Sequence, residues 1–304
     1  MAATDNRWRD NRTRAIAWLL TCQTEAGGWG YKPSGVSHTE PTALAILALL
    51  NDTKNDATAA AVARAVAWLR ASQHADGAWG ISPVDATPSW MTSYAVLALS
   101  RFGTPSAEPP IARALSWLLG EPRLVSSAEE IVLAKQQLSI DASLAGWPWT
   151  SGDADWVFPT SLAILAARRA GIGESPRAQT GVAYLLDRAC AGGGWNFGNP
   201  YMLSVPMLPT TTDTAIALLA LRETSEEHPQ ATAGLARLGE LAAKTTTPLG
   251  LAWAVLALRV CSTETVAGPF AERLALLQDA AGSWRASPFT SALTCLALAP
   301  EPRL

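Results

Sequence analysis

The sequence predicts an all-α protein folded as an (α/α)6 toroid, in which six helical hairpins form an inner and an outer ring. Three observations predict this fold. The motif Q-x3-G-x-W returns at residues 23–29, 73–79 and 278–284. Six Ala/Leu-rich segments align with one another along the chain. Six amphipathic segments alternate with them.

The amphipathic segment comes first in each hairpin. In AVARAVAWLRASQ, for example, helical spacing puts Val62, Val66 and Leu69 on one face, with Arg64 and Arg70 elsewhere. One apolar face is typical of a helix with one side in solvent. We therefore expect outer helices at about 10–23, 58–73, 109–119, 177–190, 230–244 and 269–279.

The second segment of each hairpin is apolar or small at almost every position, which predicts a helix buried on all sides. The six align as Thr42–Leu49, Thr92–Leu99, Thr160–Ala167, Thr214–Leu221, Leu251–Leu258 and Ser291–Leu298. In an open solenoid one side of this layer would face water, at roughly 1.5–3 kcal/mol per large side chain. A closed ring avoids that exposure.

Residues 1–304 are predicted to form one toroid domain with two long insertions, at 120–158 and 198–212. The first contains an extra helical stretch, Ser127–Leu138, and the loop GWPWTSGDADWVFP. Two copies lack the Gln of the motif: LAGWPW, with Gly146, Trp147 and Trp149, and GGGW, with Gly193 and Trp195. The repeat length is counted from Trp149 to Trp195. Long loops in a compact repeat fold are where function tends to lie.

Composition bears on which partners the protein binds and in which cellular compartment it works. The formal net charge of −3 gives no reason to expect nucleic acid. Four scattered cysteines suggest a reduced, cytoplasmic protein. The polar start shows no signal peptide, and no run reaches the ~20 apolar residues of a membrane span. The apolar loop at 200–209 would be a lid, a peripheral membrane contact or a subunit contact.

The repeats, with inner-helix starts such as EPTALAILAL and DTAIALLAL, resemble the superfamily of squalene-hopene cyclases and protein prenyltransferase β-subunits. The resemblance covers nearly the whole chain, and the versions GGWG and GAWG are closer to the cyclases. It implies that the Gln and Trp of each repeat are structural, the Gln capping a helix end and the Trp packing against it. It also implies a hydrophobic isoprenoid ligand.

The resemblance offers two chemistries. Zinc prenyltransferases hold zinc by Asp, Cys and His, but the histidines here are His38, His74 and His228, with no Asp-x-Cys partner for His38. We therefore expect no metal and no cofactor, with Mg²⁺ needed only for a diphosphate substrate. Class II terpene cyclases carry D-x-D-D-T-A at an inner-helix start, and the matching segment is TTTDTA, residues 210–215. Thr212 stands where the family has its proton donor.

The alignment of the inner helices suggests another acid. We call the first residue of each aligned inner segment its helix-start position. The residues two places before these positions are Glu40, Trp90, Phe158, Thr212, Leu249 and Phe289. Repeat symmetry puts these six residues, here called the acid layer, at one level of the ring. A carboxyl group among apolar side chains stays protonated and can deliver a proton. Aromatic faces stabilise a carbocation. Glu40 is thus a candidate acid, and Trp90, Phe158, Thr212 and Phe289 are candidate substrate contacts.

Each of these residues also has a structural interpretation. Glu40 precedes Pro41 in a helix first turn, where the helix dipole favours an acid by about 0.3–1 kcal/mol without any chemistry. Asp213 is either catalytic or a helix cap. Asp153 and Asp155 could reach the mouth of the central cavity, as an acid, a ligand of a metal-bound diphosphate, or a gate. Alternatively, they belong to an ordinary turn. Trp156 in that loop and His38 are further candidate substrate contacts.

Two functions remain open at this stage. One is a terpene cyclase-like enzyme that protonates an isoprenoid in a deep apolar cavity of the ring, between Glu40 and the aromatic residues. The other is a non-catalytic toroid that binds a lipid or a protein partner, because the D-x-D-D motif is incomplete. A partner subunit or a homodimer would supply a second helical domain if one is needed.

Overall fold

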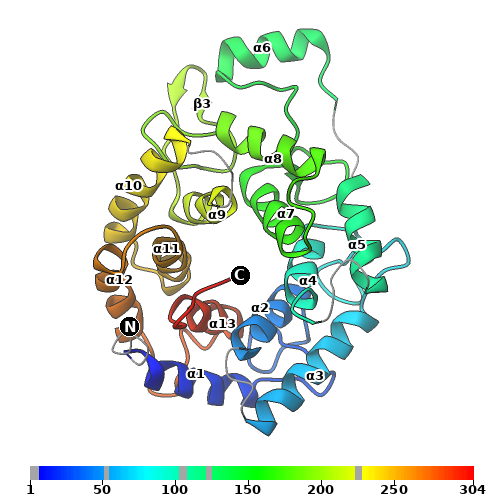
Figure 1. The fold of residues 1–304 in the computed structure, drawn as a ribbon, viewed down its shortest axis with the longest axis vertical. Helices are drawn as coiled ribbons and strands as arrows, with labels where there is room; N and C mark the ends of the chain where they lie inside the picture. The colour runs from blue at the N-terminus through cyan, green and yellow to red at the C-terminus, as the bar shows by residue number, and fades with distance from the viewer. Residues whose placement is uncertain (1–6, 51–54, 103–107, 121–124, 223–227) are drawn as a thin grey trace.

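A closed ring of six inner helices forms the centre of the molecule. The computed structural model describes residues 7–50, 55–102, 108–120, 125–222 and 228–304. The inner helices are α2 (Thr39–Leu50), α4 (Met91–Leu99), α7 (Val157–Arg169), α9 (Thr211–Leu221), α11 (Pro248–Cys261) and α13 (Pro288–Ala297). Each packs against the next, and α13 packs against α2 (Figure 1). Almost every residue of these helices is buried, as their composition predicts.

The outer ring consists of α1 (Arg9–Thr21), α3 (Asp56–Ala71), α5 (Pro109–Gly120), α8 (Pro176–Asp187), α10 (Pro229–Lys244) and α12 (Glu264–Leu276). The all-α toroid predicted from the sequence is confirmed. The predicted bounds of the last outer helix were wrong, because α12 begins at Glu264 and not near 269. Its Pro269 lies inside the helix. A proline removes one backbone N–H donor, yet the helix continues past it to Leu276, with Ala267 and Ala271 buried on either side of the proline.

The repeated Trp holds each outer helix to the loop that follows it. The indole N–H of Trp29 donates to the carbonyl oxygen of Leu19 in the last turn of α1, at 2.8 Å. The same bond recurs at Trp79, Trp147, Trp195 and Trp284. In the third copy the structural Trp is therefore Trp147, and the choice of Trp149 was wrong. Each indole adds a donor to a carbonyl in the last turn of its outer helix, where Leu19 O, for example, also accepts from the N–H of Cys22 at 3.0 Å.

The repeated Gln joins neighbouring outer helices. Nε2 of Gln278 donates to the backbone oxygens of Gly282 and Asn11, each at 2.8 Å, so this side chain links α12 to α1 and closes the outer ring. Gln23 and Gln73 make the equivalent pairs of bonds. Between Gln and Trp the chain turns at a glycine. Gly77 has φ +97°, and a Cβ there would lie 2.7 Å from the carbonyl oxygen of Arg113. Only glycine fits this conformation and this approach.

We predict that Gln278→Ala lowers the free energy of unfolding by about 2–3 kcal/mol. The variant loses four hydrogen bonds. Nε2 donates to the backbone oxygens of Gly282 and Asn11, and Oε1 accepts from the side chains of Asn11 and Arg14. Urea unfolding followed by circular dichroism would measure it. The exposed Glu25→Gln variant is the control. A loss below about 0.5 kcal/mol would show that the link between α12 and α1 is not needed for stability.

A threonine or serine hydroxyl sets the register of the inner helices. Oγ1 of Thr42 accepts from the backbone N–H of Trp29 at 2.8 Å. Thr92, Thr160, Thr214 and Ser291 do the same for the Trp of their own repeats. These five residues are the helix-start positions used to align the inner helices. The predicted alignment is therefore correct for those five helices, which supports the composition of the acid layer.

The two insertions project from the ring on one side. α6 (Ala128–Leu138) is the extra helix predicted there, and Ser127 caps its first turn. It lies outside the ring beside the hairpin of β3 (Tyr201–Met202) and β4 (Val205–Pro206) (Figure 1). A second hairpin pairs β1 (Trp147–Pro148) with β2 (Asp155–Trp156). Among the described helices, none has the length and apolar character required to cross a membrane.

Candidate functional site

Glu40 is a buried carboxylic acid at the start of α2. Its neighbour Thr39 fixes the first turn by two hydrogen bonds to the loop that follows Trp79 in the second repeat. The backbone N–H of Thr39 donates to Ile81 O at 2.9 Å, and its Oγ1 donates to Gly80 O at 2.7 Å. Pro41 lacks a backbone N–H, which a first helical turn does not need. The backbone is thus held firmly, and 6% of the Glu40 side chain remains exposed.

Two tyrosines lie against this carboxyl group. Tyr31 donates its hydroxyl to Glu40 Oε2 at 2.7 Å. Tyr94, fully buried on α4, places its hydroxyl near Glu40, but the geometry is outside that of a standard hydrogen bond, and Tyr94 Oη has no other partner among the described residues. The carboxyl group therefore accepts one hydrogen bond of standard geometry, from Tyr31, and a second hydroxyl, that of Tyr94, lies nearby.

Burial raises the pKa of Glu40 from its ordinary 4.5 to about 7. The two tyrosines act in the opposite direction and lower it, because their hydroxyls stabilise the charged form. At neutral pH a substantial fraction of the molecules therefore carries Glu40 as the neutral acid. The same environment raises the pKa of both tyrosines, so they remain hydrogen-bond donors.

Aromatic rings extend from Glu40 in both directions around the ring. On one side Tyr31 meets Phe289 edge-on, with centroids 5.9 Å apart. On the other, Tyr94 contacts Trp90 at 5.5 Å, and Trp90 contacts Phe158 at 5.6 Å. The acid-layer residues Trp90, Phe158 and Phe289 are therefore part of one aromatic group around Glu40. Aromatic faces of this kind attract a cation.

Two more tryptophans complete this group. Trp149 stacks on Phe158 with centroids 5.6 Å apart and meets Trp90 edge-on at 4.6 Å. Trp253 on α11 meets Phe158 at 5.7 Å. Tyr31, Tyr94, Trp149 and Trp253 were not among the predicted site residues. Two of them could have been found by counting, since Tyr94 and Trp253 follow the acid-layer positions Trp90 and Leu249 by four residues, one helical turn.

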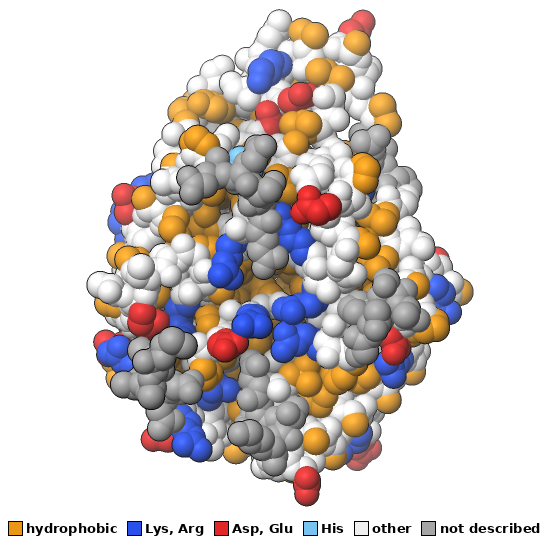
Figure 2. All heavy atoms as spheres, in the orientation of Figure 1, with side chains coloured by type: hydrophobic (Ala, Val, Ile, Leu, Met, Phe, Trp, Pro, Cys, Tyr) orange, Lys and Arg blue, Asp and Glu red, His pale blue; other side chains and the backbone are white. Residues whose placement is uncertain are grey.

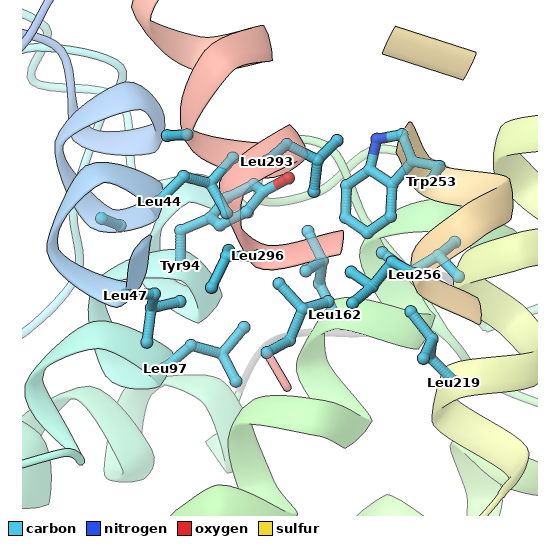
Figure 3. Packing of buried hydrophobic residues seen from close by; sticks show 14 of the residues in the cluster. Leu44, Leu47, Tyr94, Leu97, Leu162, Leu219, Trp253, Leu256, Leu293 and Leu296 are labelled. Carbon is cyan, nitrogen blue, oxygen red and sulfur yellow. The ribbon is translucent and has the colours of Figure 1, made fainter. Parts of the chain in front are cut away.

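The interior of the ring is built in layers by this helical spacing (Figure 3). Side chains of all these helices point toward one another there, and they are almost fully buried. Four residues after the acid layer come Leu44, Tyr94, Leu162, Ile216, Trp253 and Leu293. Three residues further come Leu47, Leu97, Leu165, Leu219, Leu256 and Leu296. The deep cavity expected between Glu40 and the aromatic residues is therefore occupied, below the acid layer, by packed side chains.

The structure places the other predicted residues in different surroundings. Asp213 is buried but accepts from Thr210 Oγ1 at 2.6 Å, so it belongs to the capped start of α9. Burial raises its pKa. Thr212, half-buried beside it, makes no contact with the aromatic group among the bonds described. His38 packs its ring on Tyr31 at 5.0 Å and pairs Nδ1 with Val36 O at 2.8 Å, so it adjoins the partner of Glu40.

The loop candidates lie in the β1–β2 hairpin and directly before α7. Asp155 Oδ2 accepts from the backbone N–H of Gly146 at 2.8 Å, which holds the β1–β2 hairpin together. Asp153 is exposed and accepts from the N–H of Ala154. Trp156 stands at the N-cap of α7, and its indole N–H is buried without a hydrogen-bond partner among the described residues.

A cavity of about 510 Å³ lies at the end of the inner helices opposite to Glu40. It is lined by Leu165, Arg168, Arg169, Leu219, Arg222, Arg259, Val260, Glu301, Pro302, Arg303 and Leu304. Figure 2 shows basic side chains gathered around the central hollow of this face. Within the described parts of the chain, no three His, Cys, Asp or Glu residues are placed to hold a metal ion.

Comparison with known proteins agrees with this architecture. Residues 1–85 match the family described as squalene-hopene cyclase C-terminal domain. No curated protein matches the sequence. Among solved structures, the type II terpene cyclase MstE from Scytonema superposes with a TM-score of 0.66 at 16% identity, covering 96% of this chain and 98% of the other.

Other solved structures share the fold. A protein from Actinoplanes has a TM-score of 0.65 at 20% identity, covering 95% of this chain and 98% of its own. An α-1,6-mannanase of Salegentibacter has a TM-score of 0.60 at 10% identity, covering 97% and 99%. The family match covers the first 85 residues, and the superpositions show that the helical toroid fold is shared over nearly the whole chain.

Proposed function

We propose that this protein is a terpene cyclase-like enzyme in which Glu40 protonates an isoprenoid and starts its cyclisation. The observation that carries the proposal is the Glu40 carboxyl itself, buried, with a pKa of about 7, and placed between two tyrosines inside an aromatic group. The terpene cyclase MstE, whose complex contains geranylgeranyl dihydroxybenzoate as substrate, has the same fold.

The reaction would proceed from the neutral acid. Glu40 gives its proton to a carbon–carbon double bond of the isoprenoid, and a carbocation forms at the more substituted carbon. Tyr31, already donating to Oε2, stabilises the negative charge left on the carboxylate. Neighbouring double bonds of the substrate attack the cation and close the rings beside the rings of Trp90, Phe158 and Phe289. Loss of a proton from the last cation completes an isomerisation, and solvent returns a proton to Glu40.

The surroundings of Glu40 distinguish this chemistry from that of the mannanase that shares the fold. Glycoside hydrolysis uses two carboxyl groups about 5–10 Å apart on either side of the scissile bond. The pKa of Glu40 is set by burial and by two tyrosines, and no second carboxylate contributes to it. The site therefore fits proton donation to an apolar substrate better than hydrolysis of a sugar.

Solvent deuterium tests the proposal directly. The purified protein would be incubated in D₂O with geranylgeraniol, squalene or geranylgeranyl dihydroxybenzoate, and products would be analysed by mass spectrometry. Protonation by Glu40 predicts a cyclic product with one deuterium on the alkene carbon that received the proton, and no such product from Glu40→Gln. A cyclic product without deuterium, equal turnover by Glu40→Gln, or no product from any of the isoprenoids would contradict the proposal.

The packed middle of the ring favours a second candidate, a toroid that binds a lipid or protein partner without turnover. In that case the aromatic group around Glu40 would be a binding surface. Native mass spectrometry of the freshly purified protein distinguishes the two candidates. A retained lipid that is never converted, with the same occupancy in Glu40→Gln, would support binding alone.

A further inference from the structure

The cavity at the far end of the ring gathers positive charge. Of its lining residues five are arginines and one, Glu301, is acidic, in a chain whose formal net charge is −3. Ten residues of helix at 1.5 Å each separate this level from the acid layer, roughly 15 Å along the ring axis. The arginine cavity, as we call it, is therefore distinct from the Glu40 site.

The positions of three of these arginines can be found by counting along the inner helices from the acid layer. The residues ten positions after the acid layer are Leu50, Ser100, Arg168, Arg222, Arg259 and Ala299. Arg168 and Arg259 lie in the last turns of α7 and α11, and Arg222 is the C-cap residue of α9, which lies between these two helices in the ring. Arg169 adds a second guanidinium from α7, and Arg303 adds one from the C-terminal segment that runs across this end.

Helix capping explains only part of this arrangement. A cation is favoured at a helix C-terminus, and Arg168 donates to Ala220 O while Arg259 donates to Ala297 O at 2.8 Å. That preference applies to all six inner helices, but α2, α4 and α13 have no basic residue in their last turns. The cations are concentrated on one half of the mouth, where they repel one another.

The cavity already holds acceptor groups from the chain itself. Arg169 donates to the carbonyl oxygen of Leu304, and Arg303 pairs with Glu301 at 2.5 Å. The Glu301 and Arg303 side chains are 75% and 61% exposed, so this pair separates easily and contributes little stability. Arg259 also pairs with Glu264 at 3.3 Å, so two of the five arginines of the lining have a carboxylate partner, and the lining as a whole is basic.

We propose that the arginine cavity binds a multiply charged phosphate-type anion, of which diphosphate is the simplest. Guanidinium groups match phosphate oxygens in pairs of parallel hydrogen bonds. A volume of about 510 Å³ accommodates a ligand larger than the anion alone. Leu165, Leu219 and Val260 in its lining would contact an apolar group next to the charged one. The anion displaces Glu301 from Arg303.

Isothermal titration tests the site without reference to catalysis. The probes are inorganic pyrophosphate, geranyl diphosphate and geraniol. Arg222→Gln and Arg303→Gln, both exposed side chains, should weaken binding of the diphosphates at least about tenfold each. Glu301→Gln should strengthen it, because it removes the competing carboxylate. Arg9→Gln, an exposed arginine on α1, and Glu40→Gln should leave it unchanged.

The three probes distinguish the sources of the anion. Binding of pyrophosphate equal to that of geranyl diphosphate would identify a site for a free anion. Much tighter binding of geranyl diphosphate, still lost in Arg222→Gln, would identify the head of an isoprenoid. Equal binding by the arginine variants and the parent protein, binding of geraniol as strong as that of its diphosphate, or no binding of either diphosphate would overturn the proposal. Because activity is not read, failure here leaves the role of Glu40 unaffected.

Discussion

At pH 8 the Glu40→Gln variant is expected to be more stable than the parent protein by about 3 kcal/mol while producing no cyclised product. The two effects have one cause. A carboxyl group whose folded pKa is about 7, against 4.5 when exposed, must lose its proton in a buried place as the pH rises. Glutamine has nearly the same shape, carries no charge at any pH, and has no acidic proton to give.

The sign of the pH dependence follows from proton counting. Between about pH 4.5 and 7 the folded protein keeps the Glu40 proton, whereas the unfolded chain has released it. Unfolding therefore releases a proton, and the stability of the parent falls as the pH rises through this window. Above about pH 7 both states are ionised and the difference is constant. Glu40→Gln lacks this decline, so the two proteins should be equally stable near pH 4.

Urea unfolding of both proteins at pH 4.5, 6, 7 and 8 would measure this difference, with Glu25→Gln as the matched change at an exposed position of the same repeat. The gap should open with pH for Glu40→Gln and remain absent for Glu25→Gln. A Glu40→Gln variant that is less stable than the parent at pH 8 would mean that Glu40 is buried as a stabilising carboxylate. That outcome would remove the neutral acid on which the proposed reaction depends.

The fold could be predicted because its signals are local and repeated. The apolar inner helices and the Gln-Trp turns are each visible within about 30 residues, and three intact copies make the period clear. The repeat also transfers position from one helix to another, which is why Glu40, Trp90, Phe158 and Phe289 could be placed at one level. Counting four residues on from Leu249 in this layer gives Trp253, and counting ten on from Thr212 gives Arg222.

The roles of the loop residues could not be predicted from the sequence. Tyr31 reaches Glu40 from the turn before α2, and nothing local shows that its hydroxyl points at the carboxyl group. Asp155 lies in a loop as acidic as any candidate site, but its carboxylate satisfies the N–H of Gly146. Trp147 and Trp149 are two residues apart, and only the bond to Leu118 O shows which belongs to the repeat. In each case a contact distant in sequence determines the role.

The second large effect is expected at the two tyrosines beside Glu40. Tyr31→Phe removes a hydrogen bond of 2.7 Å to a carboxyl group that becomes charged when it gives up its proton. A bond to a charged group contributes about 1.5–3 kcal/mol, so the rate should fall about 10- to 100-fold. The lost bond also raises the pKa of Glu40 above about 7, because Tyr31 normally lowers it.

The pH profile distinguishes this positioning role from a loss of structure. Activity that requires the neutral acid falls as the pH rises through the pKa of Glu40, and in Tyr31→Phe this fall should move to higher pH. Tyr94→Phe should shift it less, because Tyr94 Oη makes no hydrogen bond of standard geometry, and its removal should not lower stability. Rates for both variants from pH 5 to 9, each checked for an unchanged melting transition, would show this difference. A slower Tyr31→Phe enzyme with an unmoved pH profile would mean that Tyr31 shapes the site without acting on the proton of Glu40.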